Sequence, residues 1–233
     1  MSQSSLNPEF DSFAADYDAA LNQGLSVSGE DKTYFARGRL RWISRYLQRR
    51  GFAPQSVHDF GCGTGAATPF FYEYFPNLQR LLGTDISARS LDAATRMFGQ
   101  RGTFRLMSDY KPDASIDLAY CNGVFHHIPL AERASAAKFV FDSLRSGGVF
   151  ALCENNPWSL AARYVMSRIP FDRDARMLWP RGTRRLLRSA GFEILATHFL
   201  FIFPRMLKWF RPLERLAIHL PLGTQYVTLA RKP

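Results

Sequence analysis

The fold is decided by the stretch Val57-His58-Asp59-Phe60-Gly61-Cys62-Gly63-Thr64-Gly65. Residues 56–60 run directly into the glycines and predict a short strand, and residues 66–75 behind them predict a helix. Because glycine carries no Cβ, the backbone N–H groups of such a turn can approach a ligand closely. The stretch therefore predicts a strand, a ligand-binding loop and a helix.

Strands and helices go on alternating after this stretch. We predict helices at residues 88–98, capped by Ser87, and at 131–144. The glycine pair at 147–148 turns the chain into a fifth strand. The five strands predicted in this part of the chain lie at residues 56–60, 81–85, 103–107, 116–121 and 149–153. This alternation is typical of βαβ units and a parallel sheet.

The two ends of the chain follow other patterns. Residues 10–21 and 36–47 predict helices, and Gly51 ends the second one. That second helix carries an apolar stripe at helical spacing, formed by Ala36, Leu40, Ile43 and Leu47. The last third predicts helices at 158–168 and 183–190, strands at 192–201 and 226–230, and a basic, aromatic insertion at 204–220.

Composition limits the class of protein. The chain has 233 residues, 46% hydrophobic and 21% charged, which suits one large α/β domain with an ample core. No apolar run approaches the about 18 residues of a membrane-spanning helix, and the polar start lacks the core of a signal peptide. Cys62, Cys121 and Cys153 are odd in number and widely spaced, so we expect a reducing, cytoplasmic setting without disulfides or a metal site.

The glycine loop alone leaves two cofactors open. Gly61, Gly63 and Ala66 also satisfy the dinucleotide pattern G-x-G-x-x-G/A, so an NAD-binding oxidoreductase is one alternative. Asp85 stands at the end of the second strand, about 20 residues past the glycines, where an acidic side chain accepts both ribose hydroxyls. NAD and S-adenosylmethionine (SAM) both present such a ribose. Asp85 also suits a helix N-terminus.

The acidic residue ahead of the glycines favours SAM. Asp59, followed by Gly61, Gly63 and Gly65, resembles the first motif of class I SAM-dependent methyltransferases. In that family the loop wraps the amino-acid portion of SAM and the leading carboxylate orients it. A carboxylate attracts the ammonium and sulfonium of SAM, whereas it repels a pyrophosphate.

Three later stretches extend the resemblance. Met107-Ser108-Asp109-Tyr110 is similar to the family's adenine-binding position, with Asp109 accepting from the adenine amino group and Tyr110 against the ring. Residues 116–129, which include Asn122-Gly123 and the paired His126-His127, resemble the motif after strand four. Leu144-Arg145-Ser146-Gly147-Gly148 resembles the entry to strand five. Four motifs occur in order over residues 57–154, and NAD binding explains only the first two. The chain is identified as a member of the small-molecule class I methyltransferases.

The resemblance implies a Rossmann-like α/β fold. We expect a seven-stranded, mostly parallel sheet with an antiparallel last strand, helices on both faces and an N-terminal helical lid. One domain would span residues 1–233, with the lid at 1–52, the SAM-binding core at 53–154, and substrate-side insertions with the last two strands at 155–233. The cofactor-binding residues implied are Tyr17, Arg37, Asp59, Gly61, Cys62, Gly63, Thr64, Gly65, Asp85, Ile86, Ser108, Asp109, Tyr110, Asn122 and Gly123.

Candidate catalytic and substrate residues lie after strands four and five. Histidine as a residue type can act as a base at neutral pH, so either His126 or His127 could deprotonate an acceptor, or one could simply fix the loop. Glu154, Asn155 and Trp158 are candidate substrate contacts. Asn156-Pro157-Trp158 resembles the Asn-Pro-Pro-Tyr box of nucleic-acid amino-methyltransferases, but that box follows strand four and has a second proline. We therefore discount a nucleobase acceptor.

The sequence predicts transfer of a methyl group from SAM to an oxygen or nitrogen of a small organic acceptor, in secondary or lipid-linked metabolism. One alternative is a membrane-associated methyltransferase with a lipid-like acceptor, because residues 199–220 interleave aromatic and basic side chains. A second is an RNA methyltransferase that uses the arginine clusters of this chain of net charge +10, although no nucleic-acid module is recognised. A third is a non-catalytic protein that binds SAM or NAD.

Overall fold

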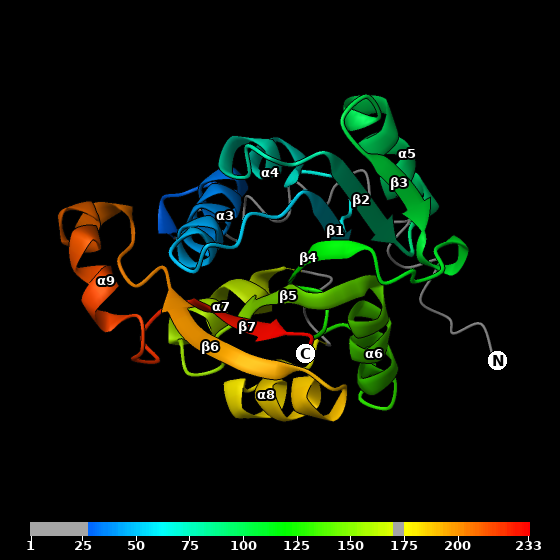
Figure 1. The fold of residues 1–233 in the computed structure, drawn as a ribbon. Helices are drawn as coiled ribbons and strands as arrows, with labels where there is room; N and C mark the ends of the chain where they lie inside the picture. Colours follow the sequence, from blue (N-terminus) through cyan, green and yellow to red (C-terminus); the bar gives the residue numbers. More distant parts are fainter. Residues whose placement is uncertain (1–27, 170–174) are drawn as a thin grey trace.

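A seven-stranded sheet in the order β3-β2-β1-β4-β5-β7-β6, with helices on both faces, forms the centre of the molecule (Figure 1). The computed structural model describes residues 28–169 and 175–233. The strands are β1 (Ser56–Phe60), β2 (Arg80–Asp85), β3 (Thr103–Leu106), β4 (Ile116–Asn122), β5 (Leu144–Asn155), β6 (Glu193–Leu200) and β7 (Gln225–Arg231). All strand pairs are parallel except those that β7 makes with β5 and β6. This is the predicted fold class, with its antiparallel last strand.

Within the described residues, one helix precedes β1, and the others connect the strands. The helices are α3 (Lys32–Gln48), α4 (Thr68–Tyr74), α5 (Ala88–Phe98), α6 (Arg133–Ser143), α7 (Leu160–Arg168), α8 (Pro180–Ser189) and α9 (Glu214–Ala217), with the 3₁₀ helices η2 (Met107–Asp109) and η4 (Arg205–Leu213). The Ser87 hydroxyl accepts from the Ser90 N–H at 3.2 Å, so the predicted cap of α5 is confirmed. Of the helices in the described ranges, none is both long and apolar enough to cross a bilayer.

Alternating side chains of β1 bury against two different helix layers. Val57 packs with the apolar stripe of α3 and with α4, in a cluster that contains Leu40 and Ile43. Phe60 points to the opposite face and packs with α6 and α8, through residues such as Val140. The sheet is therefore buried on both faces, as parallel sheets normally are.

The strand order places the ligand-binding edge. From β1 the chain moves outward to β2 and β3, then returns across β1 to continue with β4 and β5. The loops after β1 and β4 consequently diverge at the carboxyl edge of the sheet. This point of divergence is where α/β sheets bind ligands.

Strand five begins earlier than the sequence predicts. We expected the glycine pair at 147–148 to precede the strand, but β5 already starts at Leu144. Gly147 takes a φ of +76° inside it, and the register with β4 shifts between Ile116 and Leu118. The glycines thus form an irregularity within the pairing, because glycine adopts left-handed φ values at little cost.

The insertion between β6 and β7 is tied to the rest of the fold at its base. The side-chain amide of Asn156 donates to the carbonyls of Pro221 and Gly223 at 3.0 and 2.7 Å. Asn156 therefore anchors the insertion, and Ser159 is the N-cap of α7. Phe201 lies with its ring centroid 4.9 Å from that of Phe35 on α3.

The helix predicted at residues 10–21 and the candidate cofactor contact Tyr17 lie outside the described residues.

The contact between α3 and the insertion gives a stability prediction. A Cβ on Gly38 would lie 2.6 Å from the Phe201 ring, whereas a Cβ on Gly182 in α8 would meet nothing within 4 Å. We expect Gly38→Ala to lower the free energy of unfolding by about 1 kcal/mol, because overpacking costs about 1–3 kcal/mol and the helix gains only about 0.5–1 kcal/mol from alanine. Gly182→Ala should be neutral or stabilising. Urea unfolding measures both, and equal shifts would contradict the packing argument.

Candidate functional site

The glycine loop after β1 takes a backbone path that only glycine follows freely. Gly61, Gly63 and Gly65 have φ values of +72°, +51° and +75°. The N–H groups of Gly61 and Cys62 both donate to the Thr84 carbonyl, at 2.8 and 3.0 Å. The loop is therefore bonded to the end of the neighbouring strand β2.

Two of these glycines differ in their surroundings. A Cβ on Gly61 would collide with the Val124 side chain of the loop after β4. A Cβ on Gly63 would meet no atom within 4 Å, so this glycine borders open space. Gly61 is thus required for packing between two loops, and Gly63 leaves the backbone accessible to a ligand.

Asp85 joins the glycine loop to the start of α5. Its Oδ2 accepts from the Gly63 N–H at 2.8 Å, and its Oδ1 accepts from the Ser87 N–H at 2.9 Å. The sequence suggested two positions for this carboxylate, near a ribose site and at a helix N-terminus. Asp85 lies beside the glycine loop and also accepts from the N-cap residue of α5. Ile86, directly after it, is 37% exposed.

Asp59 is a buried acid next to this loop, with an exposed fraction of 4%. Burial and, to a smaller extent, the neighbouring Asp85 raise the pKa of its carboxyl to about 7. The Arg39 guanidinium lowers the same pKa and so lies close enough to act on it. The site therefore contains a carboxyl group whose charged form gains from an added cation.

Arg39 is a buried basic residue near the loop that we did not predict from the sequence as a site residue. It is 7% exposed, and its guanidinium donates to the Tyr120 hydroxyl at 3.0 Å and to Gln225 Oε1 at 2.8 Å. Arg37, which we predicted as a SAM contact, instead pairs with Glu73 at 3.3 Å and is half exposed. Its position in the sequence could have indicated this burial, because Arg39 directly precedes Leu40 of the buried apolar stripe.

Asp109 and Tyr110, which follow β3, lie in different environments. Asp109 lies exposed in η2, where its Oδ1 accepts from the Ser108 hydroxyl at 3.0 Å. The Tyr110 ring is buried, 5.2 Å from that of His58 and 5.8 Å from that of Phe139, in contact with the α6 side of the sheet. Burial raises the pKa of Tyr110 to about 12. The structure therefore does not bring Tyr110 to the predicted adenine position beside Asp109.

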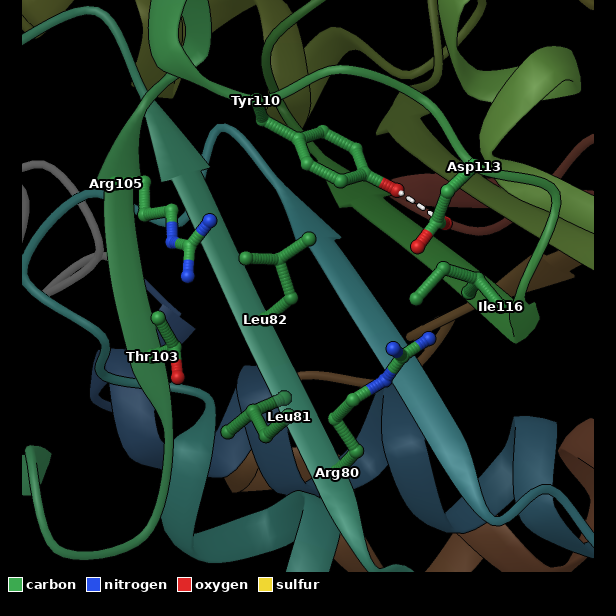
Figure 2. Close-up of a pocket in the computed structure, with 8 residues that line it drawn as sticks. All are labelled: Arg80, Leu81, Leu82, Thr103, Arg105, Tyr110, Asp113 and Ile116. Atoms are coloured by element: carbon green, nitrogen blue, oxygen red, sulfur yellow. Dashed lines mark hydrogen bonds between the residues drawn. The ribbon is translucent and has the colours of Figure 1, made fainter.

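Tyr110 lines a separate cavity of about 250 Å³. Figure 2 shows its hydroxyl pointing toward Asp113, with Arg80 and Arg105 on the neighbouring strands β2 and β3. Arg80 is the first residue of β2 and Ile116 the first of β4, so the cavity extends toward the amino ends of the strands. It lies apart from the glycine loop.

The loop after β4 is held by a buried histidine–carboxylate pair. His126 Nδ1 lies 2.6 Å from Glu154 Oε2, and the Phe125 N–H donates to the other oxygen, Oε1, at 2.9 Å. The side chains of His126 and Glu154 are 3% and 1% exposed. Glu154, predicted as a substrate contact, therefore orients His126. The His127 ring lies beside it, with centroids 4.2 Å apart.

Further hydrogen bonds to backbone carbonyls hold this loop in place. Gly123, which follows Asn122 at the end of β4, has a φ of +67° and donates to the Cys153 carbonyl at 3.0 Å. Arg133 donates to the carbonyls of Ile128 and Arg176 at 2.9 and 2.8 Å. The histidine pair is thus carried by a loop bonded on both sides.

The remaining substrate candidates flank the end of β5. Asn155 Oδ1 accepts from Gln225 Nε2 at 3.3 Å, which extends the network that begins at Arg39. Trp158 is 47% exposed, and its ring lies 5.3 Å from that of Trp179. Within residues 28–169 and 175–233, no group of three His, Cys, Asp or Glu side chains is arranged to hold a metal ion.

Comparison with known proteins finds similarity to methyltransferases in part of the chain. Residues 58–150 match the model of a methyltransferase domain. A trans-aconitate 2-methyltransferase from Azoarcus sp. is 28% identical over 145 residues, which is 61% of this chain and 56% of the relative. A second, from Rhizobium rhizogenes, is 29% identical over 119 residues, 43% of this chain and 45% of the relative. The chain spans about half the length of the curated relatives it matches.

Solved structures share the fold at low identity. A SAM-dependent methyltransferase from Archaeoglobus fulgidus superposes with a TM-score of 0.66 at 15% identity, covering 87% of this chain and 95% of the other. Magnesium protoporphyrin IX methyltransferase from Synechocystis, solved with bound S-adenosylhomocysteine, gives 0.65 at 17% identity and covers 98% of both chains. The sheet, the motifs and the domain match agree: residues 58–150 are similar to a methyltransferase domain, and the chain has the fold of SAM-dependent methyltransferases.

Proposed function

We propose that this chain binds SAM at the carboxyl edge of β1, β2 and β4 and transfers its methyl group to an oxygen or nitrogen of a small organic acceptor. The observation that carries the proposal is the buried Asp59 carboxyl and the buried Arg39 guanidinium, next to the glycine loop and Asp85.

These groups match the charges of SAM. Its amino-acid portion carries an ammonium, which suits Asp59, and a carboxylate, which suits Arg39. A guanidinium has five N–H donors, and Tyr120 and Gln225 take two of those on Arg39. Two carboxylates at the loop, Asp59 and Asp85, would repel the pyrophosphate of NAD, which disfavours the oxidoreductase alternative.

The rest of the cofactor fits the exposed groups at the same edge. Asp85 would accept from the ribose hydroxyls while keeping its bonds to the loop and to α5, since each carboxylate oxygen has two lone pairs. Asp109 would accept from the adenine amino group, and the exposed Ile86 side chain would cover a face of the ring. Asn122 and Gly123 would border the cofactor from the end of β4.

When bound, SAM supplies an electrophilic methyl group on its sulfonium. The chain's own contribution is to position an acceptor in line with that methyl group and to take up its proton. Glu154 orients the His126 imidazole, and His127 lies beside it, so this loop is our candidate for the base. We place the acceptor between this loop and residues 155–233, near Trp158. The curated relatives, which are named for trans-aconitate, support a small-molecule acceptor.

Asp85→Ala tests cofactor binding. We expect a loss of SAM affinity of about tenfold to a hundredfold, because hydrogen bonds to a charged group contribute about 1.5–3 kcal/mol. Isothermal titration with SAM or S-adenosylhomocysteine measures the change. Asp92→Ala is the matched control, since Asp92 is exposed on the adjacent helix α5 and should leave affinity unchanged. If the wild type does not bind SAM, or if Asp85→Ala leaves the affinity unchanged, the proposal is wrong.

The raised pKa of Asp59 predicts that a proton is released when SAM binds. Its folded pKa of about 7 lies above the unfolded value of about 3.9, so in the free protein it is mostly protonated at about pH 6. Protonated Asp59 therefore raises the free energy of unfolding. This contribution is fully present below the unfolded pKa and is lost as the pH rises through about 7. The ammonium of SAM should lower the pKa and expel most of one proton at about pH 6.

Titrations in two buffers with different ionisation enthalpies measure this proton. The wild type should give apparent binding enthalpies that differ between the buffers by the heat of a released proton. Asp59→Asn has no proton to release from this position, so its two enthalpies should agree. Identical heats for the wild type in both buffers would show that Asp59 keeps its protonation state.

A further inference from the structure

Residues 204–222, which contain η4 and α9, form an exposed apolar surface that we call the docking surface. Met206 and Leu216 are both 82% exposed and Trp209 is 79% exposed. The other large apolar side chains of this surface that are at least 40% exposed are Leu207, Phe210, Leu213, Leu220 and Leu222. Single exposed apolar residues are common, but so many in one short stretch indicate an interaction site.

The outward charge of this surface is positive. Its basic residues are Arg205, Lys208, Arg211 and Arg215, and its single acidic residue is Glu214. Glu214 is turned toward the protein, where its Oε1 accepts from the N–H groups of Ile202 and Phe203 at 3.1 and 2.9 Å. Lys208 and Arg215 are exposed and stand among the apolar side chains.

The inner side of the docking surface is fixed to the fold. Arg211 pairs with Glu30 at 2.8 Å and lies 4.6 Å over the Tyr34 ring. The Phe199 N–H of β6 donates to the Ile218 carbonyl at 2.7 Å. In Figure 1 the segment, drawn in orange, projects beyond the end of β6. The exposed side chains are therefore presented outward by an ordered scaffold.

We propose that the docking surface binds the surface of an anionic phospholipid bilayer. Trp209 and its apolar neighbours would enter the region between headgroups and acyl chains, where amphipathic aromatic rings are favoured. Lys208 and Arg215 would contact lipid phosphates. A second copy of the chain fits less well, because a two-fold interface would bring the same positively charged surface against itself.

The position of this surface bears on the acceptor. β6 is parallel to β5, since both are antiparallel to β7, so β6 ends and β7 begins at the carboxyl edge that also carries the glycine loop. Leu160, which is 77% exposed, and Trp179, which is 52% exposed, follow β5 at this same edge of the sheet. Resting on the proposed function, the geometry favours an amphiphilic, lipid-linked acceptor presented at the bilayer.

Vesicle co-sedimentation of the full chain tests docking. We expect the wild type to pellet at low salt with vesicles of phosphatidylcholine and phosphatidylglycerol, and less with phosphatidylcholine alone. Trp209→Ser with Leu216→Ser should weaken binding by at least about tenfold, from lost apolar burial. Lys208→Gln with Arg215→Gln should do so by roughly tenfold, from lost charge. The control is Met97→Ser with Leu130→Ser, two residues 71% and 60% exposed elsewhere, which should pellet like the wild type.

Three outcomes overturn the proposal. They are no pelleting of the wild type at low salt, pelleting of the Trp209/Leu216 variant equal to wild type, and a wild-type dimer that this variant abolishes while vesicles are not bound. Light scattering detects the dimer. SAM titration of every variant separates the two proposals, because docking variants should bind SAM normally. A wild type that pellets but binds no SAM would refute the proposed function and leave docking standing.

Discussion

The hydrogen bonds between the glycine loop and the end of β2 are the constraint on which the site depends. Gly61 and Cys62 donate to the Thr84 carbonyl, and Gly63 donates to Asp85. Because Asp85 also accepts from the N–H of Ser87, the N-cap residue of α5, one carboxylate fixes the loop after β1, the end of β2 and a helix start. These bonds require left-handed φ values in the loop, which explains glycine at alternate positions.

The second constraint on the site is the charge of two buried residues. Asp59 and Arg39 are both buried, and burial of an ionisable group is costly unless an opposite charge or hydrogen bonds compensate it. Arg39 is compensated by Tyr120 and Gln225, whereas the pKa of Asp59 stays raised. A site of this kind favours a ligand that brings a cation to Asp59 and an anion to Arg39, which is the charge pattern of an amino acid.

Topology brings the proposed reaction and the proposed membrane contact to one edge. Parallel strands present their carboxyl ends together, and the reversed direction of β7 returns the chain to that same edge before it enters the sheet. An insertion between β6 and β7 can therefore change what this edge of the sheet contacts without disturbing the glycine loop. Asn156 secures this arrangement, since its amide binds the end of the insertion next to β5.

The sequence by itself determined most strand and helix positions, though not the start of β5, and the glycine loop with Asp59 and Asp85, because periodicity, caps and left-handed turns are local properties. The seven-stranded sheet with its antiparallel last strand was implied by the family resemblance. Only the tertiary structure decided which side chains meet. Arg39 bonds residues 81 and 186 positions away, and His126 meets Glu154 across 28 positions. Tyr110 is adjacent to Asp109 in sequence, yet Asp109 is exposed and Tyr110 is buried, because the Tyr110 ring packs against His58 and Phe139. Such partners follow from packing between elements, which local patterns do not encode.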